Sequence, residues 1–299
     1  MTTPPFIPPT VGVFDSGFGG LTVLGALIAR APQAQFAFIG DTARLPYGSK
    51  SQRTIARYAA QSARFLVEEQ GADYLVIACN TASALALDAI KEAVPSSVTV
   101  IGVIEPGARS ARRASKTGDV LVIATDATVQ SHAYAETCGR EGLRALEKAC
   151  PLLVPLVEEG WIDHPVTAEV LRVYLDELNA EAAARGLNPD TLVLGCTHYP
   201  LLKPLIERSV PAGMRVIDSA EAVADSMADN LFSRSLDSVD SSDEALVQMM
   251  IDDLDPSPSV AKDTVMHFFA TDSVEKFERL GSRFLGRPVQ NVQLVDLGG

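Results

Sequence analysis

Runs of apolar residues of strand length alternate with longer amphipathic patterns along most of the chain. The runs "TVGVF" (10–14) and "DYLVIA" (73–78) are predicted to be buried strands, whereas 53–71 has the apolar spacing of a helix and ends at a glycine, a common helix C-cap. This alternation is typical of βαβ units, in which crossover helices join parallel strands. The chain is therefore predicted to be an α/β protein with parallel sheets.

The predicted elements form two successive sets. The first has strands at 10–14, 34–40, 73–78 and 97–104, with helices at 21–30, 53–71 and 82–94. The second has apolar runs at 118–125, 145–156, 190–195 and 214–218, with helices at about 167–185 and after Cys196. The same succession of strand and helix therefore occurs twice.

Two ten-residue stretches support a repeat. "DYLVIACNTA" (73–82) aligns with "DTLVLGCTHY" (190–199) without a gap, which superposes Asp73 on Asp190 and Cys79 on Cys196. We expect two similar lobes, related by a pseudo-twofold axis from an internal duplication, each a parallel sheet flanked by helices as in flavodoxin-like domains. The expected first lobe comprises 10–103 plus 214–299 and the second 104–213, with a disordered tail at 1–9 and an acidic insertion at 233–262.

Composition argues against several classes of protein. A net charge of −13 makes nucleic acid an improbable main partner, because phosphate binding needs clustered Lys and Arg. Charges interrupt every apolar run before it reaches the ~18 to 20 residues of a membrane helix, and 1–10 does not resemble a signal peptide. We expect a cytoplasmic protein, with no membrane partner, whose four cysteines are free thiols.

Polar residues follow five of the apolar runs, at the edge where ligands bind to parallel sheets. Glu158 is expected to follow a strand formed by "PLLVPLV". The residues at the five positions are Asp15 and Ser16; Asp41, Thr42 and the turn Pro46, Tyr47 and Gly48; Cys79, Asn80 and Thr81; Glu158; and Cys196, Thr197 and His198. This edge is the predicted site of function.

The glycine turn at 17–20 leaves three interpretations open. Gly17 and Gly19 fit the dinucleotide pattern G-x-G-x-x-G, with Asp41 where a ribose-binding acid would stand, but Thr22 breaks the pattern. Unpaired backbone N–H groups at a helix start would suit a carboxylate instead. The third interpretation is a tight turn without a ligand.

The two cysteines in matching positions carry the strongest chemical signal. A single cysteine after a strand is more often a buried apolar residue than a reactive group. Here both precede a predicted helix start, which lowers the pKa of a thiol, and both are followed by hydroxyl or amide side chains. Cys138 and Cys150 lack this setting and are predicted to be structural.

Several kinds of chemistry use cysteine pairs. A redox pair usually has the spacing C-x-x-C and zinc needs further ligands at short spacing, and the sequence has neither. A hydrolase or transferase with Cys196 and His198 as nucleophile and base stays open, but it leaves Cys79 without a role. Acid–base chemistry uses both thiols: inversion of an amino acid's α-carbon removes a proton from one face and returns one to the other.

Seven motifs stand out in order along the chain. They are "GVFDSGFGGLTVL", "GDTARLPYG", "ACNTASA", "GVIEPGA", "CPLLVPLVEEGW", "GCTHYPLL" and "DSA", running from Gly12 to about Ala220, with a looser match over 267–286. Together they resemble the glutamate racemases of the aspartate/glutamate racemase family. The resemblance implies interconversion of L- and D-glutamate without a cofactor or metal, which supplies D-glutamate for bacterial peptidoglycan.

The resemblance also implies roles for individual residues. Cys79 would take the α-proton of D-glutamate and Cys196 that of L-glutamate. Asp15 would assist near the substrate amine or Cys79, and Glu158 and His198 would assist Cys196, although Asp15 alone could be a helix cap. The positions that match substrate contacts are Asp15, Ser16, Pro46, Tyr47, Gly48, Asn80, Thr81, Thr197 and His198, with Thr125 or Thr128 added from the second lobe.

The resemblance says less about partners. Family members form homodimers of different geometry, some depend on a peptidoglycan-precursor activator, and some bind DNA gyrase, on which this sequence is silent. An aspartate racemase is the nearest alternative, although there the second cysteine is typically followed by Thr and Glu, whereas here Cys196 is followed by Thr197 and His198.

Because the chain is acidic, we expect backbone N–H groups and helix ends, not a cluster of arginines, to bind the anionic substrate.

Overall fold

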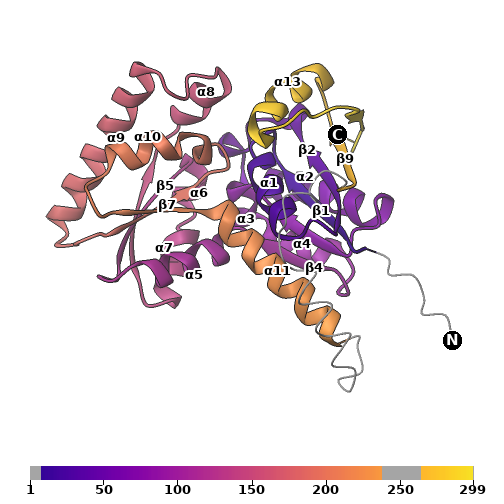
Figure 1. The fold of residues 1–299 in the computed structure, drawn as a ribbon, viewed down its shortest axis with the longest axis horizontal. Helices are drawn as coiled ribbons and strands as arrows, with labels where there is room; N and C mark the ends of the chain where they lie inside the picture. Colours follow the sequence, from indigo (N-terminus) through magenta and orange to yellow (C-terminus); the bar gives the residue numbers. More distant parts are fainter. Residues whose placement is uncertain (1–7, 238–263, 299) are drawn as a thin grey trace.

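Two parallel sheets lie at the centre of the protein (Figure 1). The structure is a computed structural model that describes residues 8–237 and 264–298. The first sheet has the order β10-β9-β2-β1-β3-β4, with β1 Thr10–Asp15, β2 Gln35–Gly40, β3 Tyr74–Ile77, β4 Thr99–Gly102, β9 Met266–Ala270 and β10 Gln293–Leu294. The second has the order β6-β5-β7-β8, with β5 Asp119–Ala124, β6 Arg144–Ala149, β7 Thr191–Gly195 and β8 Arg215–Asp218. The predicted α/β class with two parallel sheets is confirmed.

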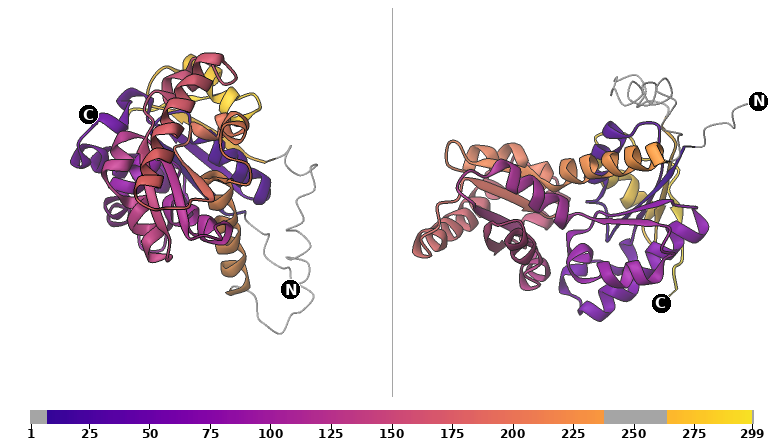
Figure 2. Two further views of the ribbon diagram at one scale, coloured as in Figure 1. Left: turned by 90° about the vertical axis from the view of Figure 1, so that its left-hand side faces the viewer. Right: turned by 90° about the horizontal axis from the view of Figure 1, so that it is seen from below.

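Helices cover both sheets and form the connections between their strands (Figures 1 and 2). Around the first sheet they are α1 Leu21–Arg30, α2 Gln52–Arg64, α3 Asn80–Leu85, α4 Leu87–Ala93, α11 Ser219–Asp237 and α13 Val274–Leu285. Around the second they are α5 Ile104–Ala114, α6 Asp126–Gln130, α7 Ala133–Arg140, α8 Leu153–Glu158, α9 Pro165–Ala184 and α10 Lys203–Ser209. Short 3-10 turns occur at η1 Thr42–Arg44, η2 Tyr47–Ser49 and η4 Tyr199–Leu202, and a π-helical turn at η3 Phe65–Glu69.

The second sheet repeats the strand order of the middle of the first. The order β2-β1-β3-β4 corresponds to β6-β5-β7-β8, so β3 matches β7, as the aligned sequences predict. The aligned aspartates also match in their contacts. The backbone N–H of Asp73 donates to the carbonyl of Thr10 at the start of β1, and that of Asp190 donates to the carbonyl of Asp119 at the start of β5. The repeat therefore extends from the strand order to individual hydrogen bonds.

One predicted strand is wrong. The run 145–156 was expected to continue as strand up to Glu158, but β6 ends at Ala149 and 153–158 form the helix α8. A short apolar run has no periodicity that separates a strand from a buried helical turn. Pro155 also fits a helix here, because it lies in the first turn, where its missing N–H costs no bond. Glu158 is consequently the last residue of a helix and does not follow a strand.

Smaller differences concern the ends of elements. The expected helix 53–71 ends as α-helix at Arg64 and continues in the π-helical turn, and the expected helix 82–94 is divided at Ala86. The lobe boundary expected at residue 214 lies before β8, yet β8 pairs with β7 in the second sheet. The tail lies outside the described residues up to residue 7, and so does the insertion from 238, whereas 233–237 belong to α11.

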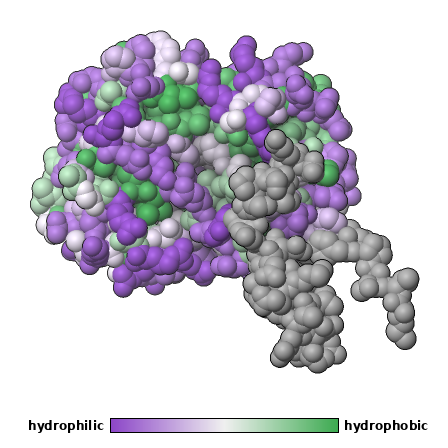
Figure 3. Space-filling model, viewed as in Figure 1, coloured by the Kyte–Doolittle hydropathy of each residue, from purple (hydrophilic) through white to green (hydrophobic). Residues whose placement is uncertain are grey.

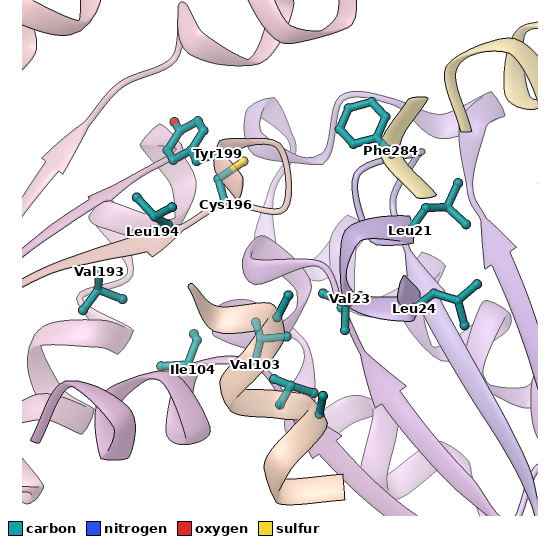
Figure 4. Close-up of a cluster of buried hydrophobic side chains, with 14 of the residues drawn as sticks. Leu21, Val23, Leu24, Val103, Ile104, Val193, Leu194, Cys196, Tyr199 and Phe284 are labelled. Atoms are coloured by element: carbon teal, nitrogen blue, oxygen red, sulfur yellow. The ribbon is translucent and has the colours of Figure 1, made fainter. Parts of the chain in front are cut away.

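The chain crosses between the lobes twice among the described residues. It leaves the first sheet between β4 and α5, and it returns after β8 through α11, which packs on α1 (Figure 1). Buried apolar residues continue across this junction: Figure 4 shows Val23 of α1 near Val103, with Leu194 of β7 in the same cluster. Packing at this junction places the carboxyl edges of the two sheets opposite each other.

The surface visible in Figure 3 is mainly hydrophilic, with separate apolar patches. Large apolar side chains that stay exposed include Leu152 and Trp161 beside α8. None of the helices in the described ranges combines the length and the apolar character needed to cross a membrane. Apolar burial is thus concentrated in the cores around the two sheets.

Candidate active site

Cys79 lies where β3 gives way to α3. It is the N-cap residue of this helix, and its Sγ accepts the backbone N–H of Ala82 at 3.4 Å while its thiol donates to Ser16 Oγ at 3.3 Å. The side chain is buried, with 5% exposure. Burial, together with the negative charge of Asp15, raises the pKa of Cys79 to about 12. The predicted lowering of this pKa by the helix start is therefore wrong, because desolvation and a like charge outweigh the helix.

Asp15 ends β1 and holds the glycine turn that follows. Its Oδ2 accepts the N–H of Gly17 at 2.9 Å, and a Cβ on Gly20 would lie 2.5 Å from the Cβ of Asp15, so only glycine fits there. The N-cap of α1 is Gly20, which excludes Asp15 as the cap of that helix. Within the described ranges, Oδ1 of Asp15 is buried without a hydrogen-bond partner. One oxygen of a buried carboxylate thus remains available for a ligand.

Cys196 stands at the end of β7 with a histidine and a glutamate behind it. Its Sγ lies 3.9 Å from Nδ1 of His198, and Nε2 of His198 lies 3.1 Å from Oε1 of Glu158. Figure 4 shows Cys196 at the end of its strand, above Leu194. The three side chains therefore form a chain of contacts that leads from the thiol towards the surface, where the Glu158 side chain is 26% exposed.

The contacts of His198 favour its charged form. Burial alone would lower the pKa of His198, but its bonds to Cys196 and Glu158 outweigh burial and raise it to about 10. Burial likewise opposes ionisation of Glu158, but the hydrogen bond and charge of His198 lower the pKa of that carboxyl. An imidazolium between a carboxylate and a sulfur stabilises negative charge on the sulfur. The structure therefore places His198 beside Cys196 and Glu158 beside His198, as the sequence predicted.

The loops that carry the two cysteine groups meet between the lobes. A Cβ on Gly19 would lie 2.2 Å from Thr197 Oγ1 and 2.7 Å from His198 Nδ1, so the glycine turn of the first lobe touches the Cys196 loop. Thr22 Oγ1 also donates to the Thr197 carbonyl at 3.2 Å. The charge of Asp15 acts on Cys79 and interacts with His198. The two predicted acid–base groups thus belong to one site.

Polar residues from both lobes complete this site. Asn80 Oδ1 accepts the hydroxyl of Tyr134 at 2.7 Å, whereas its Nδ2, among the described residues, is buried without a partner. The hydroxyl of Thr81 lies 3.1 Å from that of Thr125 and 3.3 Å from that of Thr128. Asn80 and Thr81 come from the first lobe and the other three from the second, so the predicted substrate residues are brought together across the lobe interface.

Tyr47 is held by a buried carboxylate. Its hydroxyl donates to Asp41 Oδ2 at 2.5 Å, and Asp41 Oδ1 also accepts from Arg44 and Thr271. Asp41 is fully buried, so it cannot serve a ribose as the dinucleotide interpretation requires. The phenol of Tyr47 is likewise occupied, and the network fixes the turn that brings Gly48 beside Thr125. Sequence reasoning missed this function of Asp41 and the contact of Tyr134, because neither follows from local pattern.

Cations stand next to Glu158. A hollow of about 250 Å³ is lined by Glu158, Glu159, Lys276, Arg279, Leu280 and Arg283. The cations belong to α13, where the sequence suggested no site residue. The expectation that backbone N–H groups and helix ends, and no cluster of arginines, attract the substrate in its pocket stays a prediction. Within the described part of the chain, no group of three or more His, Cys, Asp or Glu side chains is arranged to hold a metal ion.

The fold and the paired cysteine loops define a two-lobed α/β protein with one site between the lobes, and comparison with known proteins gives the family. The family described as "Asp/Glu/Hydantoin racemase" matches residues 22–227. The chain therefore belongs to the Asp/Glu/hydantoin racemase family.

Relatives within the family are more specific. A glutamate racemase of Koribacter versatilis is 52% identical over 97% of this chain and 98% of its own. A crystal structure of glutamate racemase from Francisella tularensis in complex with D-glutamate has a TM-score of 0.79 and 32% identity over 97% of this chain and 98% of that one. An Escherichia coli glutamate racemase in complex with L-glutamate and the activator UDP-MurNAc-Ala has a TM-score of 0.66 and 25% identity over 93% of this chain and 96% of that one. The similarity thus runs along nearly the whole chain.

Proposed function

We propose that this protein interconverts L- and D-glutamate by an acid–base mechanism that uses two cysteines and no cofactor. The observation that carries the proposal is the meeting of two cysteine loops, one from each lobe, at a single interface with different electrostatic partners. Cys79 has Asp15 and Ser16 beside it, and Cys196 has His198 and Glu158. A full-length likeness to glutamate racemases supports the choice of substrate.

The proposed reaction balances one proton lost against one gained. Starting from L-glutamate, the Cys196 thiolate, stabilised by the imidazolium of His198, removes the α-proton. The planar carbanion then takes the proton of the Cys79 thiol on its opposite face, which yields D-glutamate. The reverse direction starts from a Cys79 thiolate and a Cys196 thiol. The high pKa of Cys79 suits its role as proton donor in the first direction.

Unpaired polar atoms support a charged, polar ligand at this place. Within the described ranges Asp15 Oδ1 and Asn80 Nδ2 are both buried without a partner, and such atoms are rare unless a ligand or water binds them. Asp15 suits the ammonium group and Asn80 a carboxylate. We assign the second carboxylate to the threonine hydroxyls of both lobes, with Ser16, Thr197 and the turn Pro46–Gly48 as further contacts.

The biological setting belongs to the same proposal. D-glutamate made here would enter peptidoglycan, in the cytoplasm, where the four unpaired cysteines are stable as thiols. We propose a homodimer, with its geometry open.

Dependence of the racemase activity on a precursor such as UDP-MurNAc-Ala, the activator in the E. coli structure, is decided by an assay with and without that compound. Binding to DNA gyrase is decided by a pull-down that does not depend on the cysteines.

The proposal is tested by deuterium exchange at the α-carbon in heavy water, starting from pure L- and pure D-glutamate. We expect the wild type to racemise both without added cofactor, and Cys79→Ala and Cys196→Ala each to lose racemisation. Cys138→Ala is the matched control, because this thiol is equally buried but lies away from the site. Near-normal racemisation by either site variant would exclude the two-thiol mechanism. Racemisation of aspartate alone would retain the mechanism and change the substrate.

A further inference from the structure

Helix α13 packs on the first lobe, yet two consecutive residues near its end contact the Cys196 side of the site. The ring of Phe284 meets the imidazole of His198 edge-on, with centroids 5.0 Å apart and planes at 76°. Arg283 Nη1 donates to the backbone carbonyl of Glu158 at 3.2 Å. One helix therefore holds both residues that stand behind Cys196, although they come from different elements of the other lobe.

The turn after α8 is shaped around this contact. Gly160 has a φ of +82°, and a Cβ there would lie 2.7 Å from Nη1 of Arg283. The backbone conformation therefore favours glycine, and a Cβ would have to displace the guanidinium. Arg283 can bond the Glu158 carbonyl only because this neighbouring residue has no side chain. The close packing of the Gly160 turn against the Arg283 guanidinium is a second observation, beside the hydrogen bond to the Glu158 carbonyl, that places Arg283 against the end of α8.

Phe277 and Gly281, which lie on the same buried face of α13 as Phe284, fix the helix to the first lobe. Phe277 packs against Phe18 with centroids 5.7 Å apart and against Phe38 at 5.9 Å, and a Cβ on Gly281 would lie 2.9 Å from Leu21 Cδ1. Aromatic packing at these distances is favourable and restricts movement. Arg283 and Phe284 are therefore placed by the core of one lobe, while His198 and Glu158 are placed by the other.

The alignment of His198 leaves little tolerance. Its Nδ1 lies 3.9 Å from Cys196 Sγ, a long separation even for a hydrogen bond to sulfur. A small tilt of the imidazole would therefore break this contact. The edge of Phe284 restricts the tilt, and the bond from Arg283 keeps the end of α8, and with it the Glu158 carboxylate, opposite Nε2.

We infer that Arg283 and Phe284 are positioning residues, which dock Glu158 and His198 onto the first lobe and so hold His198 against Cys196 when the lobes are together. Neither residue needs to touch the substrate. The inference rests on the proposed racemase reaction. It implies that lobe closure and alignment of the Cys196 acid–base group are one event.

Arg283→Met tests this inference, because methionine keeps much of the length but neither the donor nor the charge. We expect kcat/KM to fall about tenfold, the usual effect of losing a hydrogen bond from a charged group. The two enantiomers have equal energy, so kcat/KM must fall equally in both directions. The isotope effects with α-deuterated substrate should diverge: larger for L-glutamate, whose proton Cys196 removes, and smaller for D-glutamate.

Controls separate positioning from other effects. Arg279→Ala removes one positive charge from the same helix and the same hollow, and we expect kcat/KM within twofold of wild type. Arg283→Lys keeps a donor and a charge and should restore part of the rate, and Phe284→Leu should shift the isotope effects in the same directions as Arg283→Met. If Arg283→Met does not fold, as judged by circular dichroism, Arg283→Lys and Phe284→Leu decide the matter by the same isotope effects.

Two results would overturn the inference. One is a loss in Arg283→Met no larger than in Arg279→Ala. The other is a pair of isotope effects that stay unchanged or move in the same direction in the folded variants. A wild type that does not racemise glutamate would contradict the proposed function instead, so the two failures are distinguishable.

Discussion

At the scale of single residues, the two cysteines differ in what surrounds them. Cys79 faces a carboxylate, Asp15, whereas Cys196 faces an imidazole that is held protonated by Glu158. The environment therefore favours a protonated thiol at Cys79, whereas the partner of Cys196 is a cation. The matching local sequences do not reveal this difference, because the partners come from other segments of the chain.

The contribution of Asp15 to Cys79 can be measured. Burial comes first and the charge of Asp15 second among the causes that raise the pKa of Cys79 to about 12. Asp15→Asn removes the like charge, so this pKa should fall, and alkylation of Cys79 by iodoacetamide at pH 8 should become about three- to tenfold faster. Mass spectrometry of the labelled peptide measures the rate, with Cys138 in the same sample as control. Slower or unchanged labelling of Cys79 would contradict the assigned cause.

At the scale of elements, the aspartates that precede β3 and β7 join neighbouring strands. Asp190 accepts from Ser115 Oγ at 2.7 Å and from the backbone N–H groups of Lys116 and Thr117. Asp73 accepts from the N–H of Thr10, the first residue of β1. Burial opposes ionisation of Asp190, but its hydrogen bonds outweigh burial and lower its pKa to about 2. The carboxylate that precedes β3 thus holds the start of β1, and the carboxylate that precedes β7 holds the residues just before β5.

Asp190→Asn should therefore lower the urea midpoint of unfolding at pH 7, and by more than Asp73→Asn, which loses fewer bonds. A carboxyl whose pKa is lower in the folded than in the unfolded chain stabilises the fold above the unfolded value, and this contribution is lost as the pH falls through the folded value. The difference between wild type and Asp190→Asn should accordingly shrink as the pH falls from about 4 to about 2. Circular dichroism in urea at several pH values measures it. A constant difference would show that charge is not involved.

Sequence pattern predicted the strands better than the helices near the site. Periodicity and apolar content located the strands that are buried on both faces, and the aligned aspartates and cysteines revealed the repeat. The sequence pattern failed at 153–158, where a run of six residues is too short to show a helical period. It also gave no reason to select Arg283 or Phe284, because their importance depends on which lobe they reach in space. Contacts between lobes are the part of the site that local pattern cannot predict.

At the scale of the whole molecule, the site exists only where the two lobes meet. Hydrogen bonds from Thr22 to the Thr197 carbonyl and from Tyr134 to Asn80 cross this interface. Each lobe has its own sheet, and among the described residues no strand pairing crosses the interface. The lobes approach each other closely at Gly19, since a Cβ there would be 2.2 Å from Thr197 Oγ1. A methyl group at this position would therefore oppose closure more than it would oppose folding.

Gly19→Ala should consequently lower kcat/KM for both enantiomers by about a hundredfold, because misplacement of a catalytic group by about 1 Å has an effect of this size. Its melting temperature should stay within a few degrees of wild type, since opening of the lobes relieves the clash. Gly25→Ala is the matched control: it lies in α1, its Cβ would be 3.7 Å from Leu285 Cδ1, and it should keep full activity while gaining about 0.5 to 1 kcal/mol of stability. Steady-state kinetics measure kcat/KM, and calorimetry measures the melting temperature. X-ray scattering gives the radius of gyration, which reports the opening of the lobes. Full activity in Gly19→Ala would mean that catalysis does not require the closed interface seen here, whereas an inactive variant with a larger radius and an unchanged melting temperature would identify closure as the step that assembles the site.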